Sequence, residues 1–241
     1  MRYVGGKARI AKEVSEVILS LASDRGSYYE PFVGGGAMME KMAPRFQQSF
    51  IGDFSEDLIL MWRNIHSGWR PELEISEDEY AALREAEPSA LRGLVGFGGS
   101  FGGKWFGGYA RGGIQSSGKP RNHQNESARS VCKTGELISG ANIEFRAQSF
   151  VQWQPTAGSV VYCDPPYNET TGYSASGGFD SAYFWSVMDS WVELGANVFV
   201  SEYAAPEGWD CVWEKAVKQS LTTTKQGRPE AIERLFTKGE K

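Results

Sequence analysis

Apolar residues recur at helical spacing near the amino terminus, and short apolar runs follow them. Ile10, Val14 and Ile18 fall on one face, so we expect an amphipathic helix from about Ala8 to Ala22. In chain order, the pattern then predicts a strand over 28–33, a helix over 37–42, a strand over 49–53 and a helix over 56–65. This alternation indicates a parallel sheet with helices on its faces.

The alternation stops after residue 68. Ser76 and Glu79 form a capping box for a short helix to about Glu87, and a glycine-rich stretch then runs to about Gly140. The sheet pattern returns with strands expected over 143–145, 160–163 and 198–201 and a helix over 181–194. We therefore predict one α/β domain made of residues 1–68 and 141–241, interrupted by a mainly helix-and-loop module at 69–140.

The composition agrees with one sizeable core, since the 241 residues are 41% hydrophobic and 23% charged. No window reaches the roughly 18 consecutive apolar residues that a membrane span needs, and the amino terminus lacks the apolar region of a secretory signal. We expect a soluble, cytosolic protein with no membrane partner. Three cysteines without CxxC spacing and two histidines support neither a disulfide framework nor a zinc site, so we expect no metal.

A basic segment lies within this acidic chain of net charge −5. Residues 91–133 contain seven Lys or Arg residues and one acid, Glu126, and ten of the 29 glycines lie between Gly93 and Gly113. Aromatic residues alternate with these glycines, at Phe97, Phe101, Trp105, Phe106 and Tyr109. Because basic side chains meet phosphates and flat rings meet bases, the segment is a candidate nucleic-acid surface. The alternative is a surface loop whose aromatic side chains pack against the core.

Three consecutive glycines follow the first expected strand. The stretch Glu30–Gly36 lies at the carboxyl end of that strand, where open α/β sheets bind ligands. It fits neither G-x-G-x-x-G nor a phosphate-binding loop, so a nucleoside cofactor without phosphates fits better. Asp53 ends the next strand, where an acid can accept hydrogen bonds from ribose hydroxyls. The alternative role for Asp53 is a helix cap.

The tetrapeptide Asp164-Pro165-Pro166-Tyr167 follows the apolar strand at 160–163 and lies at the same edge of the sheet. The two prolines make a rigid loop with fixed carbonyl acceptors. If Asp164 and the Pro165 carbonyl accept the two hydrogens of an exocyclic amine such as adenine N6, the nitrogen lone pair becomes available to a methyl sulfonium. Tyr167 would stack on the flipped-out base. A structural proline turn is the alternative.

These motifs stand in a known order. Tyr3-Val4-Gly5-Gly6-Lys7, Glu30–Gly36, Gly52-Asp53 and Asp164–Tyr167 resemble the Dam-type (D12 class) S-adenosylmethionine-dependent DNA adenine-N6 methyltransferases. The resemblance extends to the glycine- and aromatic-rich recognition region at 97–111, to Val200-Ser201 and to the carboxyl-terminal hairpin at 220–236. It implies a Rossmann-like methyltransferase sheet with helices on both faces, in which the module at 69–140 is the target-recognition insertion.

The resemblance also implies roles for individual residues. Catalysis falls to Asp164, Pro165, Pro166 and Tyr167. Contacts to the cofactor, S-adenosylmethionine, are expected from Tyr3, Lys7, Phe32, Val33, Gly34, Gly35, Gly36, Asp53, Ser149, Phe150 and Asp164. The basic segment supplies candidate DNA contacts at Lys104, Trp105, Arg111, Lys119 and Arg121, and the resemblance adds Arg2.

The chain departs from the family pattern in two places. Gly98-Gly99-Ser100 and Gly107-Gly108 stand where the best-known GATC-specific members carry asparagine and arginine residues, so their target sequence does not carry over. The tail has threonines at Thr222–Thr224 and fewer basic residues than is common, so a DNA contact there does not carry over either.

The sequence therefore predicts a site-specific enzyme that methylates N6 of a flipped-out adenine in duplex DNA, with restriction–modification as a suggested context. Related loops methylate cytosine N4, RNA adenine or a protein glutamine, and these targets stay open as alternatives. A catalytically silent DNA-binding module is a further alternative, against which the intact Asp164, Tyr167 and Lys7 argue. The oligomeric state stays open.

Overall fold

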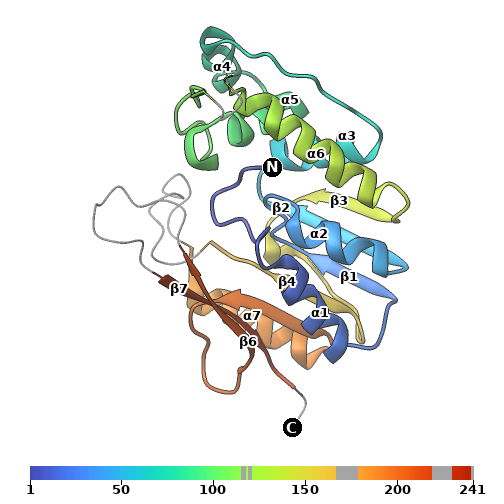
Figure 1. The fold of residues 1–241 in the computed structure, drawn as a ribbon. Helices are drawn as coiled ribbons and strands as arrows, with labels where there is room; N and C mark the ends of the chain where they lie inside the picture. The colour runs from blue at the N-terminus through green and yellow to red at the C-terminus, as the bar shows by residue number, and fades with distance from the viewer. Residues whose placement is uncertain (115–117, 119–120, 167–178, 219–229, 240–241) are drawn as a thin grey trace.

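A computed structural model describes residues 1–114, 118, 121–166, 179–218 and 230–239. These residues form a seven-stranded sheet in the order β3-β2-β1-β4-β5-β7-β6 (Figure 1). The strands are β1 (Ser27–Glu30), β2 (Gln48–Asp53), β3 (Ile143–Ala147), β4 (Val160–Cys163), β5 (Asn197–Glu202), β6 (Asp210–Lys218) and β7 (Glu230–Thr237). The first five strands are parallel, and β7 is antiparallel to both β5 and β6. The expected Rossmann-like sheet is therefore confirmed.

Helices cover both faces of the sheet. Successive strand residues point to opposite faces, and the apolar side chains on each face are buried by a helix layer. Tyr28 and Val160 are buried with α1 (Ala11–Leu21) and α2 (Ala37–Met42), whereas Tyr29 and Val161 are buried with α7 (Ser181–Glu193). The described helices of four or more residues in α geometry are α1 (Ala11–Leu21), α2 (Ala37–Met42), α3 (Glu56–His66), α4 (Glu77–Arg84), α5 (Ala90–Gly93), α6 (His123–Ile138) and α7 (Ser181–Glu193).

The predicted strands and helices agree with the structure apart from their ends, but the sequence pattern missed α5, α6 and β6, and the hairpin expected over 220–236 begins earlier, at Asp210. The first strand ends at Glu30 and not at residue 33, because Pro31 has no N–H for the ladder. The sequence pattern did not reveal α6, since its buried face includes the polar or small residues Gln124, Ser127, Thr134 and Gly135. Those residues hide the apolar periodicity on which helix prediction depends.

Residues 69–140 contain α4, α5, a π-helical turn at Leu94–Gly98 and α6. A buried ion pair joins this part to α3, with Arg92 Nη1 at 2.6 Å from Asp57 Oδ2. α6 also packs on α3, where a Cβ on Gly135 would lie 2.6 Å from Ile65 Cγ2. The division of the chain into a catalytic domain and a recognition insertion at these boundaries stays a prediction.

The carboxyl-terminal hairpin completes the sheet. β7 lies between β5 and β6, and its Phe236 is opposite Val200 on one side and Cys211 on the other. Residues 219–229, which include the threonines of the tail, are outside the described part of the chain. In that described part, no helix combines the length and the apolar character needed to cross a membrane.

Candidate active site

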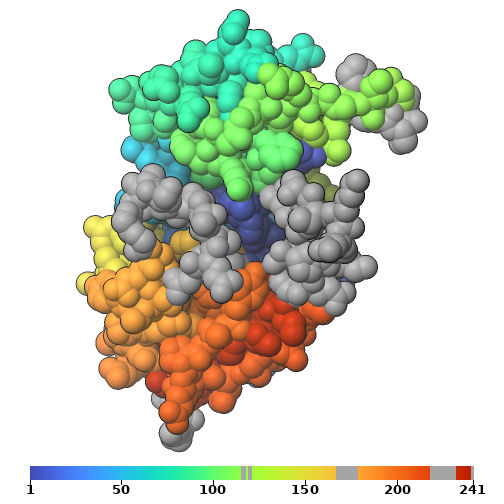
Figure 2. Space-filling view, turned by 90° about the vertical axis from the view of Figure 1, so that its left-hand side faces the viewer, coloured from blue at the N-terminus to red at the C-terminus, as the bar shows by residue number. Residues whose placement is uncertain are grey.

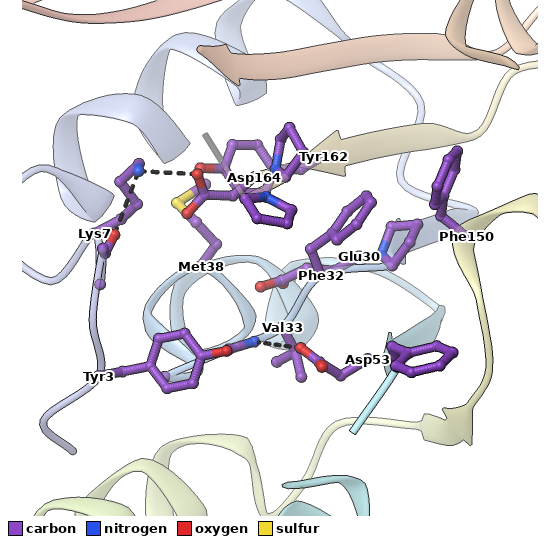
Figure 3. A pocket seen from close by; sticks show the side chains of 18 of the residues that line it. Tyr3, Lys7, Glu30, Phe32, Val33, Met38, Asp53, Phe150, Tyr162 and Asp164 are labelled. Atoms are coloured by element: carbon purple, nitrogen blue, oxygen red, sulfur yellow. Dashed lines mark hydrogen bonds and ion pairs between the residues drawn. The ribbon is translucent and has the colours of Figure 1, made fainter. Parts of the chain in front are cut away.

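A cavity of about 450 Å³ opens at the carboxyl ends of β1, β2 and β4 (Figure 3). The amino-terminal segment, residues 3–7, forms one wall of it. The predicted site residues that line it are Tyr3, Lys7, Phe32, Val33, Gly34, Gly35, Asp53, Ser149, Phe150, Asp164, Pro165 and Pro166. The structure thus brings together the amino-terminal segment, residues 30–54 and described residues between 148 and 179. Tyr167, the fourth member of the predicted catalytic motif, is outside the described residues.

The glycine turn after β1 allows two aromatic rings to approach the backbone. A Cβ on Gly34, where φ is +45°, would lie 2.8 Å from Tyr3 Cε1. Gly36 has φ of +74°, and a Cβ there would lie 2.6 Å from Trp62 Cζ2. Gly36 is not among the residues that line the cavity, so its visible role is to turn the chain into α2 beside Trp62. Its cofactor contact stays a prediction.

Both oxygens of Asp53 accept backbone hydrogen bonds. The N–H of Gly34 donates to Oδ2 at 3.1 Å (Figure 3), and the N–H of Ser55 donates to Oδ1 at 3.0 Å. Burial raises the pKa of Asp53 to about 6, although these N–H groups and that of Phe54 act in the opposite direction. Ser55, whose hydroxyl accepts from the N–H of Leu58, caps α3, so the helix-cap alternative for Asp53 is wrong.

Lys7 and Asp164 form an ion pair inside the cavity. Lys7 is only 6% exposed, and its Nζ lies 2.9 Å from Asp164 Oδ1 (Figure 3). Burial alone would lower the pKa of Lys7, but Asp164 and Glu233 raise it above its usual value. Lys7 therefore stays charged at neutral pH and holds the carboxylate that the sequence assigns to catalysis.

Glu30 is an acid of the cavity wall for which the sequence motifs predict no separate role. It is 1% exposed, and the Tyr28 hydroxyl donates to its Oε2 at 2.7 Å. Burial raises the pKa of Glu30 to about 8, while the hydrogen bonds from Tyr28 and from the Met39 N–H act in the opposite direction. Glu30 is therefore mostly protonated at neutral pH and adds little negative charge to the cavity.

Aromatic rings and one amide form the wall near β3. Phe32 and Phe150 lie 5.5 Å apart between ring centroids, and Phe150 lies 6.1 Å from Phe179. Gln148 also lines this wall, and its Nε2 is buried with no hydrogen-bond partner among the described residues. An apolar aromatic wall beside an unsatisfied donor fits a heteroaromatic ring with a nitrogen acceptor. The sequence did not point to Gln148, because a glutamine in a loop carries no motif.

None of the predicted DNA contacts among the described residues lines the cavity. Figure 2 shows amino-terminal residues, coloured blue, at the bottom of a hollow between the green region, which contains the basic segment, and the orange and red carboxyl-terminal strands. The structure brings Arg2 and Arg121 together on Glu126, with Arg2 Nη2 at 3.5 Å and Arg121 Nε at 2.8 Å. Lys119 is outside the described residues.

The other basic and aromatic candidates differ in exposure. Lys104 is exposed, and Arg111 pairs with Glu77 at 2.5 Å on the surface. Trp105 is 38% exposed, and its ring packs on Phe97 at 4.8 Å between centroids and under the guanidinium of Arg92. The interpretation in which aromatic side chains pack against the core thus holds for part of the segment.

Comparison with known proteins supports the reaction class. Residues 3–87 match the model of the D12 class N6 adenine-specific DNA methyltransferase family. The resemblance seen in the motifs is therefore confirmed over this part of the chain. The protein is therefore a methyltransferase, and S-adenosylmethionine is its methyl donor.

Solved methyltransferase structures are similar along most of the chain but distant in sequence. The N-methyltransferase NodS from Bradyrhizobium japonicum is 10% identical, with 96% of each chain covered and a TM-score of 0.43. Magnesium protoporphyrin IX methyltransferase from Synechocystis, solved with bound SAM, is 9% identical over 98% of this chain and 81% of its own, with a TM-score of 0.42. An rRNA methylase from Streptococcus thermophilus is 7% identical over 95% and 96%, with a TM-score of 0.39. These identities are too low to indicate a shared substrate.

Proposed function

We propose that the protein transfers a methyl group from S-adenosylmethionine to N6 of an adenine in duplex DNA. The observation that carries the proposal is the shared cavity: Asp164 and Pro165 line the same space as the glycine turn and Asp53. A carboxylate, a proline-fixed loop and a nucleoside pocket are thus within reach of one another. The family match over residues 3–87 supports adenine N6 as the acceptor.

The residues of the cavity fit a nucleoside cofactor. Asp53 would accept hydrogen bonds from ribose hydroxyls, and the purine would lie against the aromatic wall that Phe32 and Phe150 form. The buried Nε2 of Gln148 would donate to a ring nitrogen and so gain the partner that it lacks among the described residues. When bound, the cofactor supplies an electrophilic methyl group on a sulfonium.

The catalytic loop would act on the amine and not on the methyl group. Asp164 and the carbonyl of Pro165 would accept the two N6 hydrogens, which moves the nitrogen towards tetrahedral geometry and frees its lone pair. The N6–methyl bond would form as the sulfur–methyl bond breaks, and the methylated N6 would pass one proton to the Asp164 carboxylate, which would release it to solvent. Pro166 has no N–H, so it cannot donate to a neighbouring acceptor in the loop.

The adenine would have to leave the base stack to reach this cavity, and Tyr167 would stack on it. Arg2, Lys104, Arg111, Lys119 and Arg121 would contact the DNA backbone, and Trp105 would contact bases or sugars. In this proposal residues 69–140 read the DNA, and residues 1–68 with 141–241 carry out the chemistry. A role in restriction–modification stays a prediction.

The test uses labelled S-adenosylmethionine and unmethylated genomic DNA, followed by sequencing that maps each modified base. We expect label on adenine N6 in one sequence motif, and label on cytosine N4 or only on RNA would contradict the proposal. Folded Asp164→Ala protein should lose about 100-fold or more in methyl transfer, since it lacks an acceptor that acts on the amine during attack. Near-normal turnover by this variant would remove the proposed mechanism.

A further inference from the structure

The Lys7 ammonium group has three N–H donors, and acceptors from three described residues lie near it. They are Asp164 Oδ1 at 2.9 Å, the Gly5 carbonyl at 3.4 Å and Glu233 Oε2 at 3.5 Å. The acceptors come from the loop after β4, the amino-terminal segment and β7. The side chains of Lys7, Asp164 and Glu233 are 5%, 20% and 15% exposed, so little water screens their charges.

The charges of this cluster do not cancel. Two carboxylates share one ammonium, and Glu202 at the end of β5 also interacts electrostatically with all three. Burial raises the pKa of Glu202 to about 7, so that carboxyl is only partly ionised at neutral pH. The ion-pair cluster of Lys7, Asp164 and Glu233 therefore carries a net negative charge.

The net charge of the cluster affects how strongly the Asp164 carboxylate accepts a hydrogen bond. An ammonium group paired only with Asp164 would weaken the pull of that carboxylate on an amine hydrogen. A second carboxylate on the same ammonium offsets this effect. During methyl transfer the positive charge moves from the sulfonium to N6, and a negative cluster beside N6 favours that movement.

We infer that Glu233 is a positioning residue for methyl transfer, which holds Lys7 and keeps Asp164 an effective acceptor. The inference rests on the proposed function and deepens it. Glu233 is not among the residues that line the cavity, so in this inference it acts through Lys7. It also gives the carboxyl-terminal hairpin a part in the chemistry, which the sequence did not suggest.

The experiment compares three variants of the full-length protein with the wild type. Glu233→Gln removes the charge at nearly constant shape, and Glu233→Asp keeps the charge. Glu214→Gln is the matched control, since Glu214 lies on the same hairpin, pairs with Arg234 at 3.1 Å and is exposed. The measurements are the single-turnover rate at saturating cofactor and DNA, the Kd for each, the Tm and the titration of the Lys7 ε-carbon by ¹³C NMR. The Lys7 signal is assigned by its loss in Lys7→Arg.

We expect Glu233→Gln to slow the single-turnover rate by about 10-fold or more, with both Kd values within about 2-fold of the wild type. Lys7 should lose its proton at a lower pH in this variant, because one of the carboxylates that stabilise the ammonium is gone. Glu233→Asp should restore most of the rate, and Glu214→Gln should match the wild type in every measurement.

An unchanged rate, or a slower rate with an unchanged Lys7 titration, would overturn the inference. A defect of equal size in Glu214→Gln would overturn it as well, because the hairpin would then act only through its stability. A wild-type protein that leaves DNA adenine unmodified would defeat the proposed function instead, and the Lys7 titration in the DNA-free protein would still decide whether Glu233 holds Lys7.

Discussion

The indole N–H of Trp62 donates to the carbonyl of Gly34 at 3.1 Å, and both groups are buried. Trp62 is on α3, so this bond ties the glycine turn of the cavity to the helix that follows the next strand. The same ring faces Gly36. The shape of the glycine turn that lines the cavity therefore depends on Trp62, a core residue that belongs to none of the sequence motifs.

Gly36→Ala should destabilise the protein by about 2 kcal/mol, because an L side chain at a φ of +74° is strained and its Cβ would clash with Trp62. Urea unfolding measures the difference. Gly140→Ala is the matched control, since a Cβ there meets nothing within 4 Å, and it should change stability by no more than about 0.5 kcal/mol. Equal stability of both variants would show that the turn tolerates a side chain.

Cofactor affinity should depend on the ionisation of Asp53. The pKa of this group is about 6, and ribose hydroxyls donate best to the ionised form. The ionised fraction falls as pH drops through 6, so the affinity for S-adenosylmethionine should be about 10-fold weaker at pH 5 than at pH 7. Calorimetry at the two pH values measures this. Asp53→Asn should bind S-adenosylmethionine more weakly at both pH values, with the same affinity at each. If the wild-type affinity is equal at the two pH values, Asp53 does not bind the cofactor in its ionised form.

Glu30 should make folding stability depend on pH. Its pKa is about 8 in the folded protein against an ordinary 4.5, so the folded state binds a proton that the unfolded chain lacks between those values. The associated stability is fully present below pH 4.5 and is lost as pH rises to about 8. Glu30→Gln mimics the protonated form, and its stability should fall less over this range. Parallel curves of unfolding free energy against pH for the two proteins would disprove this.

The pair of Arg2 and Arg121 on Glu126 provides a test of DNA binding. Glu126 pairs with both arginines, so under the proposed function a DNA phosphate would compete with this carboxylate for them. Glu126→Gln should therefore strengthen duplex binding several-fold and steepen the dependence of log K on log salt by about one unit. Glu136→Gln on the same helix is exposed and serves as the control. Salt slopes that agree among wild type and both variants would place the DNA elsewhere.

The fold and much of the cavity could be predicted from the sequence, because both depend on local patterns. Apolar runs marked β1, β2 and β4, and the topology of parallel strands then placed Asp53 and Asp164 at one edge. α6 was missed because its buried face is partly polar. Glu233 and Gln148 carry no local signal, since their partners lie far along the chain and only packing brings them near the cavity.

The position of β7 in the sheet has a consequence for the order of assembly during synthesis. β6 precedes β7 in the chain, yet β7 separates it from β5, so β6 reaches the sheet only through β7. Until residues 230–237 have left the ribosome, the nascent chain presents the unpaired edge of β5, which is a site for mispairing with other strands. Truncation within β7 should thus yield aggregates and not a smaller folded enzyme.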